Sequence, residues 1–87
     1  MGELQVSVVS ADREVWSGAA KQVVARTTEG EIGILPGHEP VLGILGAGEV
    51  RITPVNGSPL VARAEDGFLS VENDTVTIVA GQAELLS

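Results

Sequence analysis

The chain has 87 residues, no cysteine, and twelve acidic side chains against five basic ones, which gives a formal net charge of −7. A chain of this length can form one domain with one modest core, which we expect to span residues 1–87. The lack of cysteine excludes thiol catalysis, thiolate metal sites and disulfides. The negative charge makes nucleic acid and anionic lipid poor partners and a basic protein surface a good one.

Neither a membrane span nor a signal peptide is predicted. The apolar runs are only a few residues long, far short of the roughly 18 that indicate a membrane span. The N-terminus also lacks a basic stretch followed by an apolar one. A cytosolic location is therefore the expectation.

Alternating apolar and polar side chains predict a series of short strands, each with one wet face. In chain order they cover residues 4–8, 23–28, 50–52, 60–64, 68–72 and 75–80. Trp16 and Phe68 are the only aromatic residues, so the core must consist mainly of Val, Ile, Leu and Ala, and Trp16 is expected to cover part of a sheet. No segment has a convincing helical stripe, although residues 82–86 could begin a helix.

Turn residues separate the predicted strands. Asn56-Gly57 predicts a hairpin between residues 50–52 and 60–64, and the flanking Pro54 and Pro59 suggest that its distal end lies at a sheet edge. Asp66-Gly67 predicts a tight bend before Phe68, and Asn73-Asp74 predicts a turn between the last two strands. Many short strands joined in this way indicate an all-β fold, an antiparallel sandwich or barrel.

The segment GEIGILPGHEP, residues 30–40, contains the only histidine, His38. An acyl-transfer site would need a serine or threonine near His38 and a carboxylate such as Glu31 or Glu39, but the segment has neither Ser nor Thr. A metal site could use Glu29, Glu31 and His38, although a single histidine is a poor start for a metal centre.

Two other interpretations of this segment stay open. In the first, His38 is a polar loop residue, the glycines permit unusual dihedral angles and the prolines fix the path of the loop. In the second, apolar Ile32, Ile34 and Leu35 inside an acidic rim of Glu29, Glu31 and Glu39 form a docking surface.

Six segments, found in this order, carry a resemblance to a known family. They are VVSA at residues 8–11, VWSG at 15–18, GEIGILPGH at 30–38, GEVRI at 48–52, GFLSV at 67–71 and VTIVA at 76–80. With Pro40 and Leu42 continuing the third segment, the whole chain resembles the N-terminal domain of the epsilon subunit of bacterial F-type ATP synthase, called delta in mitochondria.

The resemblance implies a single domain with an antiparallel ten-stranded β-sandwich. It also implies a non-catalytic rotor subunit in the central stalk of a proton-translocating ATP synthase, without cofactor or metal. The subunit would be a monomer within a hetero-oligomer, peripheral to the cytoplasmic face of the bacterial cell membrane, with no insertion into lipid. The C-terminal helical hairpin common in the family is absent from this sequence, so neither inhibition nor nucleotide binding is assigned.

The resemblance also suggests two sets of contacts, one with the membrane c-ring and one with the gamma subunit. The expected ring contacts are Glu29, Glu31, Gly33, Gly37, His38 and Glu39. The expected gamma contacts are Ser10, His38 and Leu42. The alternatives are a stand-alone binding or metal-dependent enzyme domain centred on Glu31, His38 and Glu39, and a scaffold domain of the same fold with other partners.

Overall fold

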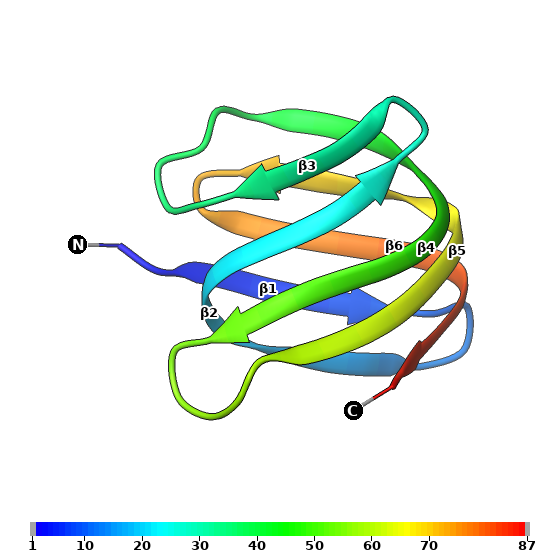
Figure 1. Ribbon diagram of the computed structural model, residues 1–87, viewed down its shortest axis with the longest axis horizontal. Coiled ribbons are helices and arrows are strands. Elements are labelled where there is room, and N and C mark those ends of the chain that lie inside the picture. Colours follow the sequence, from blue (N-terminus) through cyan, green and yellow to red (C-terminus); the bar gives the residue numbers. More distant parts are fainter. Residues whose placement is uncertain (1, 87) are drawn as a thin grey trace.

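The computed structural model describes residues 2–86, apart from the side chain of Ala47, and within them the chain forms six strands and no helix (Figure 1). Accordingly, the described part of the chain has no helix that could cross a membrane. The strands are β1 (Leu4–Val9), β2 (Glu14–Thr27), β3 (Gly30–Ile34), β4 (Val41–Pro54), β5 (Leu60–Glu72) and β6 (Thr75–Leu85).

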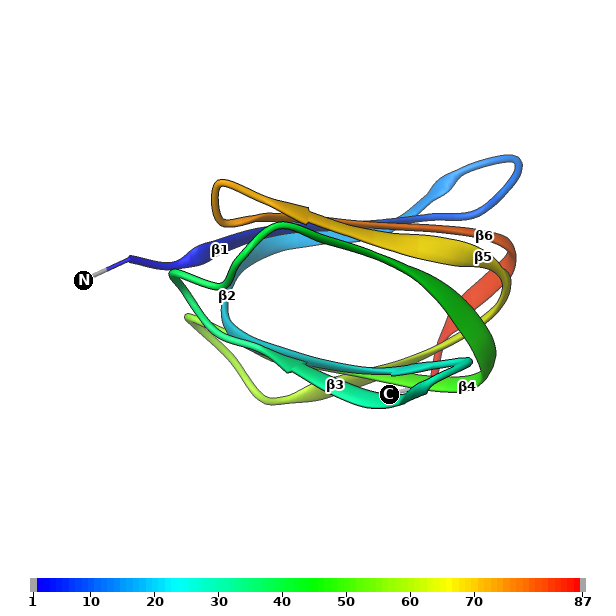
Figure 2. The ribbon, with the colours of Figure 1, turned by 90° about the horizontal axis from the view of Figure 1, so that it is seen from above.

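The strands form one sheet in the order β1-β6-β5-β4-β2-β3, and β1 also pairs with β2, so the sheet closes on itself. Seen from above, the closed sheet is flattened into two layers around a common interior (Figure 2). All pairs are antiparallel except β1 with β6, which is parallel. The predicted all-β sandwich is confirmed.

Four strands, β2, β4, β5 and β6, bend and run through both layers (Figure 2). The ten separate strands that the resemblance implied are therefore not found among the described residues. In β5 the bend lies at Asp66, which has a φ of 58°, and at Gly67. Pairing with β6 skips Asp66 and Gly81 there, because Glu65 lies opposite Gln82 and Gly67 opposite Ala80. The bend predicted from Asp66-Gly67 is present, but it lies inside one strand, and each bent strand contributes one segment to each layer.

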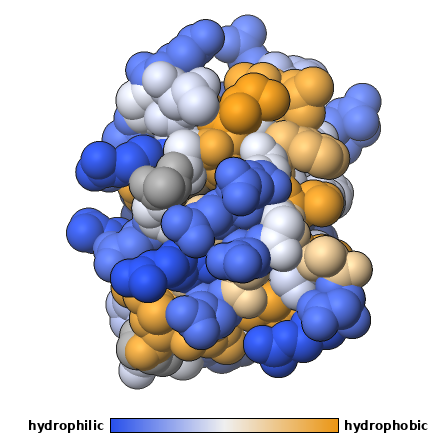
Figure 3. Space-filling model, turned by 90° about the vertical axis from the view of Figure 1, so that its right-hand side faces the viewer, coloured by the Kyte–Doolittle hydropathy of each residue, from blue (hydrophilic) through white to orange (hydrophobic). Residues whose placement is uncertain are grey.

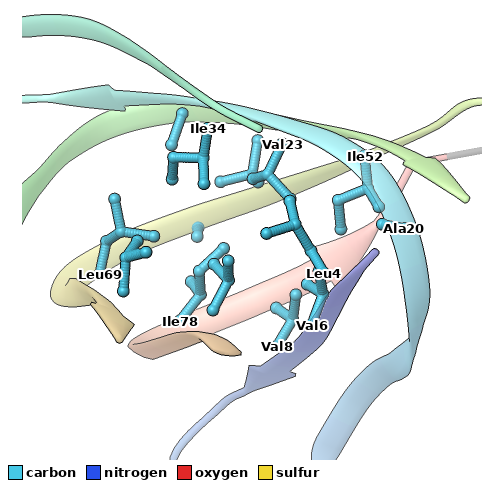
Figure 4. Packing of buried hydrophobic residues seen from close by; sticks show 14 of the residues in the cluster. Leu4, Val6, Val8, Ala20, Val23, Ile34, Ile52, Leu69 and Ile78 are labelled. Atoms are coloured by element: carbon cyan, nitrogen blue, oxygen red, sulfur yellow. The ribbon is translucent and has the colours of Figure 1, made fainter. Parts of the chain in front are cut away.

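The core fills the space between the layers with small and branched aliphatic side chains (Figure 4). Leu4, Val6 and Val8 alternate inward along β1, as the sequence predicted, and meet Val23, Ile52, Leu69 and Ile78 from the other strands. Trp16 is half-buried and packs against this cluster from the side. An added Cβ at Gly18 would lie 3.1 Å from the Trp16 ring, so the absence of a side chain at Gly18 makes room for the indole.

Three local predictions need correction. Residues 14–22 were not predicted as strand, because they alternate poorly, yet they form the first half of β2. The C-terminal helix is wrong, since residues 82–85 continue β6 and pair with residues 62–65 of β5, and this pairing outweighs a weak helical propensity. The hairpin at Asn56-Gly57 is confirmed, but the sheet edge expected from Pro54 and Pro59 is not found at β4, which lies between β5 and β2. Pro54 is tolerated there because the strand ends at that residue.

Candidate docking surfaces

Residues 28–31 connect β2 to the start of β3, and we call them the β2–β3 turn. They present two exposed carboxylates, those of Glu29 and Glu31. The Thr27 hydroxyl donates to the Gly30 carbonyl at 2.8 Å and accepts from the Glu29 amide at 3.1 Å. The Thr28 amide donates to the Ile44 carbonyl at 2.9 Å, which ties the turn to β4. Gly30 has a φ of 120°, which side chains disfavour. The turn is therefore fixed by hydrogen bonds on several sides.

The loop between β3 and β4 begins with a tight turn over residues 35–38. The His38 amide donates to the Leu35 carbonyl at 3.1 Å, Pro36 occupies the second position, and Gly37 has a φ of 89° at the third. This is the arrangement of a type II turn, which favours proline and then glycine at these positions. The His38 ring donates from Nδ1 to the Glu39 carbonyl at 2.7 Å, since a carbonyl can only accept.

Strand β3 separates these two features, so the expected acidic rim is divided. Glu29 immediately precedes β3 and Glu31 is its second residue, whereas His38 and Glu39 come after the end of the strand. A strand advances about 3.3 Å per residue, so Gly30 and Ile34 are about 13 Å apart. Figure 1 shows the β2–β3 turn at the upper right and the β3–β4 loop at the left.

This separation removes the support for a metal-dependent enzyme centred on Glu31, His38 and Glu39. The three side chains would have to converge on one ion, and β3 holds Glu31 at the far end from the other two. Within residues 2–86, no group of three or more His, Cys, Asp or Glu side chains could hold a metal ion.

Ser10 lies just after β1, in the loop to β2, whereas His38 lies in the β3–β4 loop, and Figure 1 shows these two loops on opposite sides of the molecule. Ser10 is only 7% exposed, and its hydroxyl lies 3.0 Å from Asp12 Oδ1 and 3.2 Å from the Arg13 carbonyl. Its amide also donates to the Arg13 carbonyl at 2.8 Å. Ser10 therefore stabilises its own loop, and the structure does not bring it together with His38 and Leu42.

An apolar surface that sequence reasoning missed lies on the outer side of β4 and β5. We call it the apolar face and define it as Leu42, Ile44 and Phe68, which are 71%, 58% and 41% exposed. Ile44 lies directly opposite Phe68, and Leu42 is two residues before Ile44 on the same side of β4. The buried Leu45 lies on the opposite side of β4. The sequence could have indicated this surface, because large apolar residues occur on both sides of this half of the strand.

The outer side of the other layer is charged instead. Arg26, Arg51 and Arg63 line a shallow pocket there together with Glu31 and Glu49. Cross-strand pairing sets Arg26 opposite Glu31 and Arg63 opposite Glu49, so charges of both signs alternate. Figure 3, which looks onto the right-hand end of Figure 1, shows hydrophilic residues across the middle of that end and hydrophobic residues toward its top and bottom.

The chain matches one protein family over almost its full length. The family described as ATP synthase, Delta/Epsilon chain, beta-sandwich domain matches residues 3–86. The ATP synthase epsilon chain of Micrococcus luteus is 53% identical over 85 residues, which cover 98% of this chain and 93% of the relative. That of Rhodococcus erythropolis is 54% identical over 86 residues, which cover 98% of this chain and 70% of the relative.

Solved structures show the same fold. A chain in the Euglena gracilis mitochondrial ATP synthase, solved with OSCP, F1 and c-ring, superposes with a TM-score of 0.90 at 24% identity; the match covers 99% of this chain and 55% of that one. A chain of the central stalk and c-ring of the Tetrahymena thermophila mitochondrial ATP synthase gives 0.76 at 19% identity, with coverages of 94% and 66%.

The resemblance drawn from the six sequence segments is thus confirmed by the family match and by relatives more than 50% identical. This chain belongs to the family of the ATP synthase delta and epsilon chains.

Proposed function

We propose that the chain is a non-catalytic subunit of the central stalk of a proton-translocating F-type ATP synthase. In this role it joins the membrane c-ring to the gamma subunit, from a peripheral position on the cytoplasmic face of the membrane. The observation that carries the proposal is a closed sheet, of the epsilon family, with two separate surfaces suited to other proteins. One is an acidic turn and the other is the apolar face.

The apolar face is the proposed contact with gamma. Three large apolar side chains that lie on neighbouring strands and are exposed to water cost free energy that a partner surface would recover. Leu42 belongs to this face, and His38 lies in the loop that leads into β4 just before it. Gly37 and Glu39, which were expected with His38 as ring contacts, share that loop, so all three are left out of the ring contact proposed below. Ser10, from the original set of gamma contacts, has its hydroxyl engaged within its own loop and is left out of this proposal.

The β2–β3 turn is the proposed contact with the c-ring. Glu29 and Glu31 would attract basic side chains in the loops of the ring, and Gly33 lies on the same strand, β3, which pairs only with β2 within the described sheet. Exposed charge pairs contribute only about 0.2 to 1 kcal/mol each. Their main effect is therefore on orientation and on the rate of assembly.

The test of this proposal reverses both charges of the turn. In the assembled synthase of the organism that carries this chain, Glu29→Lys/Glu31→Lys should reduce proton-driven ATP synthesis by about tenfold, because like charges would then face the ring. Binding to gamma should persist, since the apolar face is untouched.

The matched control is Glu3→Lys/Glu14→Lys, which changes the net charge by the same amount at two exposed sites outside the turn. This control should keep most of the ATP synthesis. Equal losses in the two double variants would show that net charge, and not the β2–β3 turn, is responsible, and full activity of the first variant would remove the turn from the coupling path.

A further inference from the structure

We infer that Asp74 is a positioning residue that locks the turn of residues 35–38 to the body of the sheet. Asp74 lies in the turn between β5 and β6, and its carboxylate Oδ1 accepts a hydrogen bond from the Gly37 amide at 2.7 Å. The two residues are 37 positions apart in the sequence. The effect of this lock on docking rests on the function proposed above, whereas the lock itself does not.

Three segments distant in sequence meet at Asp74. Figure 1 shows two of them, the β5–β6 turn and the β3–β4 loop, on the left-hand side. Besides the bond to Gly37, the Asp74 carbonyl accepts from the Gln5 amide at 2.8 Å, which ties down the start of β1. Gly2 also lies close, because a Cβ built there would be 3.2 Å from Asp74 Oδ2 and 3.5 Å from the Pro36 Cβ. A single residue thus connects the N-terminal segment, the β3–β4 loop and the β5–β6 turn.

The β3–β4 loop has little else to hold it. Its other described hydrogen bonds run from the His38 amide to Leu35 and from the His38 ring to Glu39, and both are internal to the loop. The bond to Asp74 Oδ1 is 2.7 Å long, at the short end of the usual range for an N–H···O bond. It acts directly on Gly37, the residue whose positive φ defines the turn.

The backbone conformation of Asp74 limits which residue types at this position could form the bond to Gly37. Asn73 and Asp74 have φ values of 50° and 60° in a two-residue turn between the paired Glu72 and Thr75, the geometry of a type I′ turn. Gly, Asn and Asp tolerate this conformation well, whereas most other residues are strained. Of these three, only Asp and Asn also offer a side-chain oxygen to Gly37, so position 74 answers two requirements at once.

Two substitutions separate these requirements. Asp74→Gly keeps the turn conformation and removes the acceptor, whereas Asp74→Asn keeps both. Asn73→Gly is a control in the same turn, next to Asp74. The measurement is amide hydrogen exchange by NMR on the full chain, at Gly37 and at Gln5. Gln5 is an internal reference, because its partner is the backbone carbonyl of residue 74, which no side-chain change removes.

We expect Asp74→Gly to speed exchange at Gly37 by about tenfold or more while Gln5 stays within about twofold. Asp74→Asn and Asn73→Gly should both leave Gly37 within about threefold of the parent chain. Unchanged exchange at Gly37 in Asp74→Gly, or a parallel rise at Gln5, would overturn the lock. Failure of Asn to restore protection would overturn the role given to the acceptor.

A second measurement tests the consequence for docking. If the lock positions His38 beside the apolar face, Asp74→Gly should bind gamma about threefold to tenfold more weakly and Asp74→Asn should restore the affinity. Faster amide exchange at Gly37 in Asp74→Gly, with unchanged affinity for gamma, would show that the lock does not serve docking. The proposed function is tested separately, by the charge-reversal variants and by the apolar-face variants described below.

Discussion

At the scale of single residues, Gly67 has less room for a side chain than any other glycine of the chain. It lies at the bend of β5, where a Cβ would overlap the Val79 carbonyl oxygen and lie 2.5 Å from the Ala80 Cα. Both neighbours belong to the backbone of β6, which cannot move aside without breaking the pairing of the two strands. Gly33, by contrast, has no atom within 4 Å of the same construction and is exposed.

These surroundings give opposite expectations for two equivalent substitutions. Gly67→Ala should lower the free energy of unfolding by about 3 kcal/mol or more, because the new methyl group has no room. Gly33→Ala should change it by no more than about 0.5 kcal/mol. Urea unfolding of both variants measures the difference, and similar midpoints for the two would mean that the bend at Gly67 relaxes easily.

The sequence is a good guide to residues whose role is local. Pro36-Gly37 and Asn73-Asp74 have the residue types that their turns require, and the second turn was predicted from that dipeptide alone. The bond from Gly37 to the Asp74 carboxylate could not be predicted, because it depends on how two loops meet in the folded sheet. His38 agrees with one interpretation that the sequence left open, that of a polar loop residue, because its ring is bonded to the neighbouring backbone carbonyl.

At the scale of elements, β4 shows where alternation stops being informative. Its second half alternates clearly, with Val50 and Ile52 buried and Glu49 and Arg51 exposed, and was predicted. Its first half offers Leu42 and Ile44 on one side and Leu45 on the other, so the pattern alone cannot say which side is the core. Only the pairing with β5 shows that Leu42 and Ile44 lie on the outside.

The position of these side chains predicts an effect on binding with little effect on folding. Leu42→Ser/Ile44→Ser should weaken binding to gamma by at least about tenfold, or about 1.4 kcal/mol, because contact residues at the centre of an interface contribute most of its affinity. The unfolding free energy should fall by less than about 1 kcal/mol, since both side chains are already exposed. Titration calorimetry and urea unfolding give the two values.

A matched control exists at the C-terminal end of β6. Leu85→Ser/Leu86→Ser also replaces two exposed leucines, 40% and 42% exposed, but outside the apolar face. It should leave the affinity for gamma within about twofold. If both double variants bind gamma as the parent does, the apolar face is not the contact.

At the scale of the whole molecule, β1 closes the sheet. Ser7 in its middle lies opposite Ser17 of β2 on one side and Thr77 of β6 on the other. The strand therefore has neighbours on both edges, whereas β3 pairs only with β2, and residues 41–43 of β4 and 82–85 of β6 each pair only with β5. This closure protects strands that would otherwise offer unpaired backbone groups to other chains.

Breaking the ladder at β1 should therefore affect the entire fold. Ser7→Pro removes a backbone donor from a strand that is paired on both sides, and we expect it to lower the melting temperature sharply and to cause aggregation at micromolar concentration. Ser7→Ala keeps the backbone and should melt within a few degrees of the parent chain. Light scattering during a thermal melt compares them, and a soluble, cooperatively folded proline variant would show that β1 is dispensable for closure.

The architecture was predictable at the level of class and family, but not in its connections. Spacing and turn residues indicated an all-β sandwich, and six ordered segments indicated the family. Neither revealed that residues 60–64 and 68–72 form one strand, because a bend at Asp66-Gly67 looks the same in sequence whether the chain ends a strand there or continues through it.

The unbroken strands have a mechanical consequence for a part that must transmit force. If two layers were joined only by side-chain packing, one could slide over the other under load. Here β2, β4, β5 and β6 each pass from layer to layer as continuous polypeptide, so sliding of one layer over the other would also have to bend these strands or disturb their pairing. A force on the β2–β3 turn, the proposed contact with the c-ring, would therefore reach Leu42 and Ile44, in the proposed contact with gamma, through continuous paired backbone.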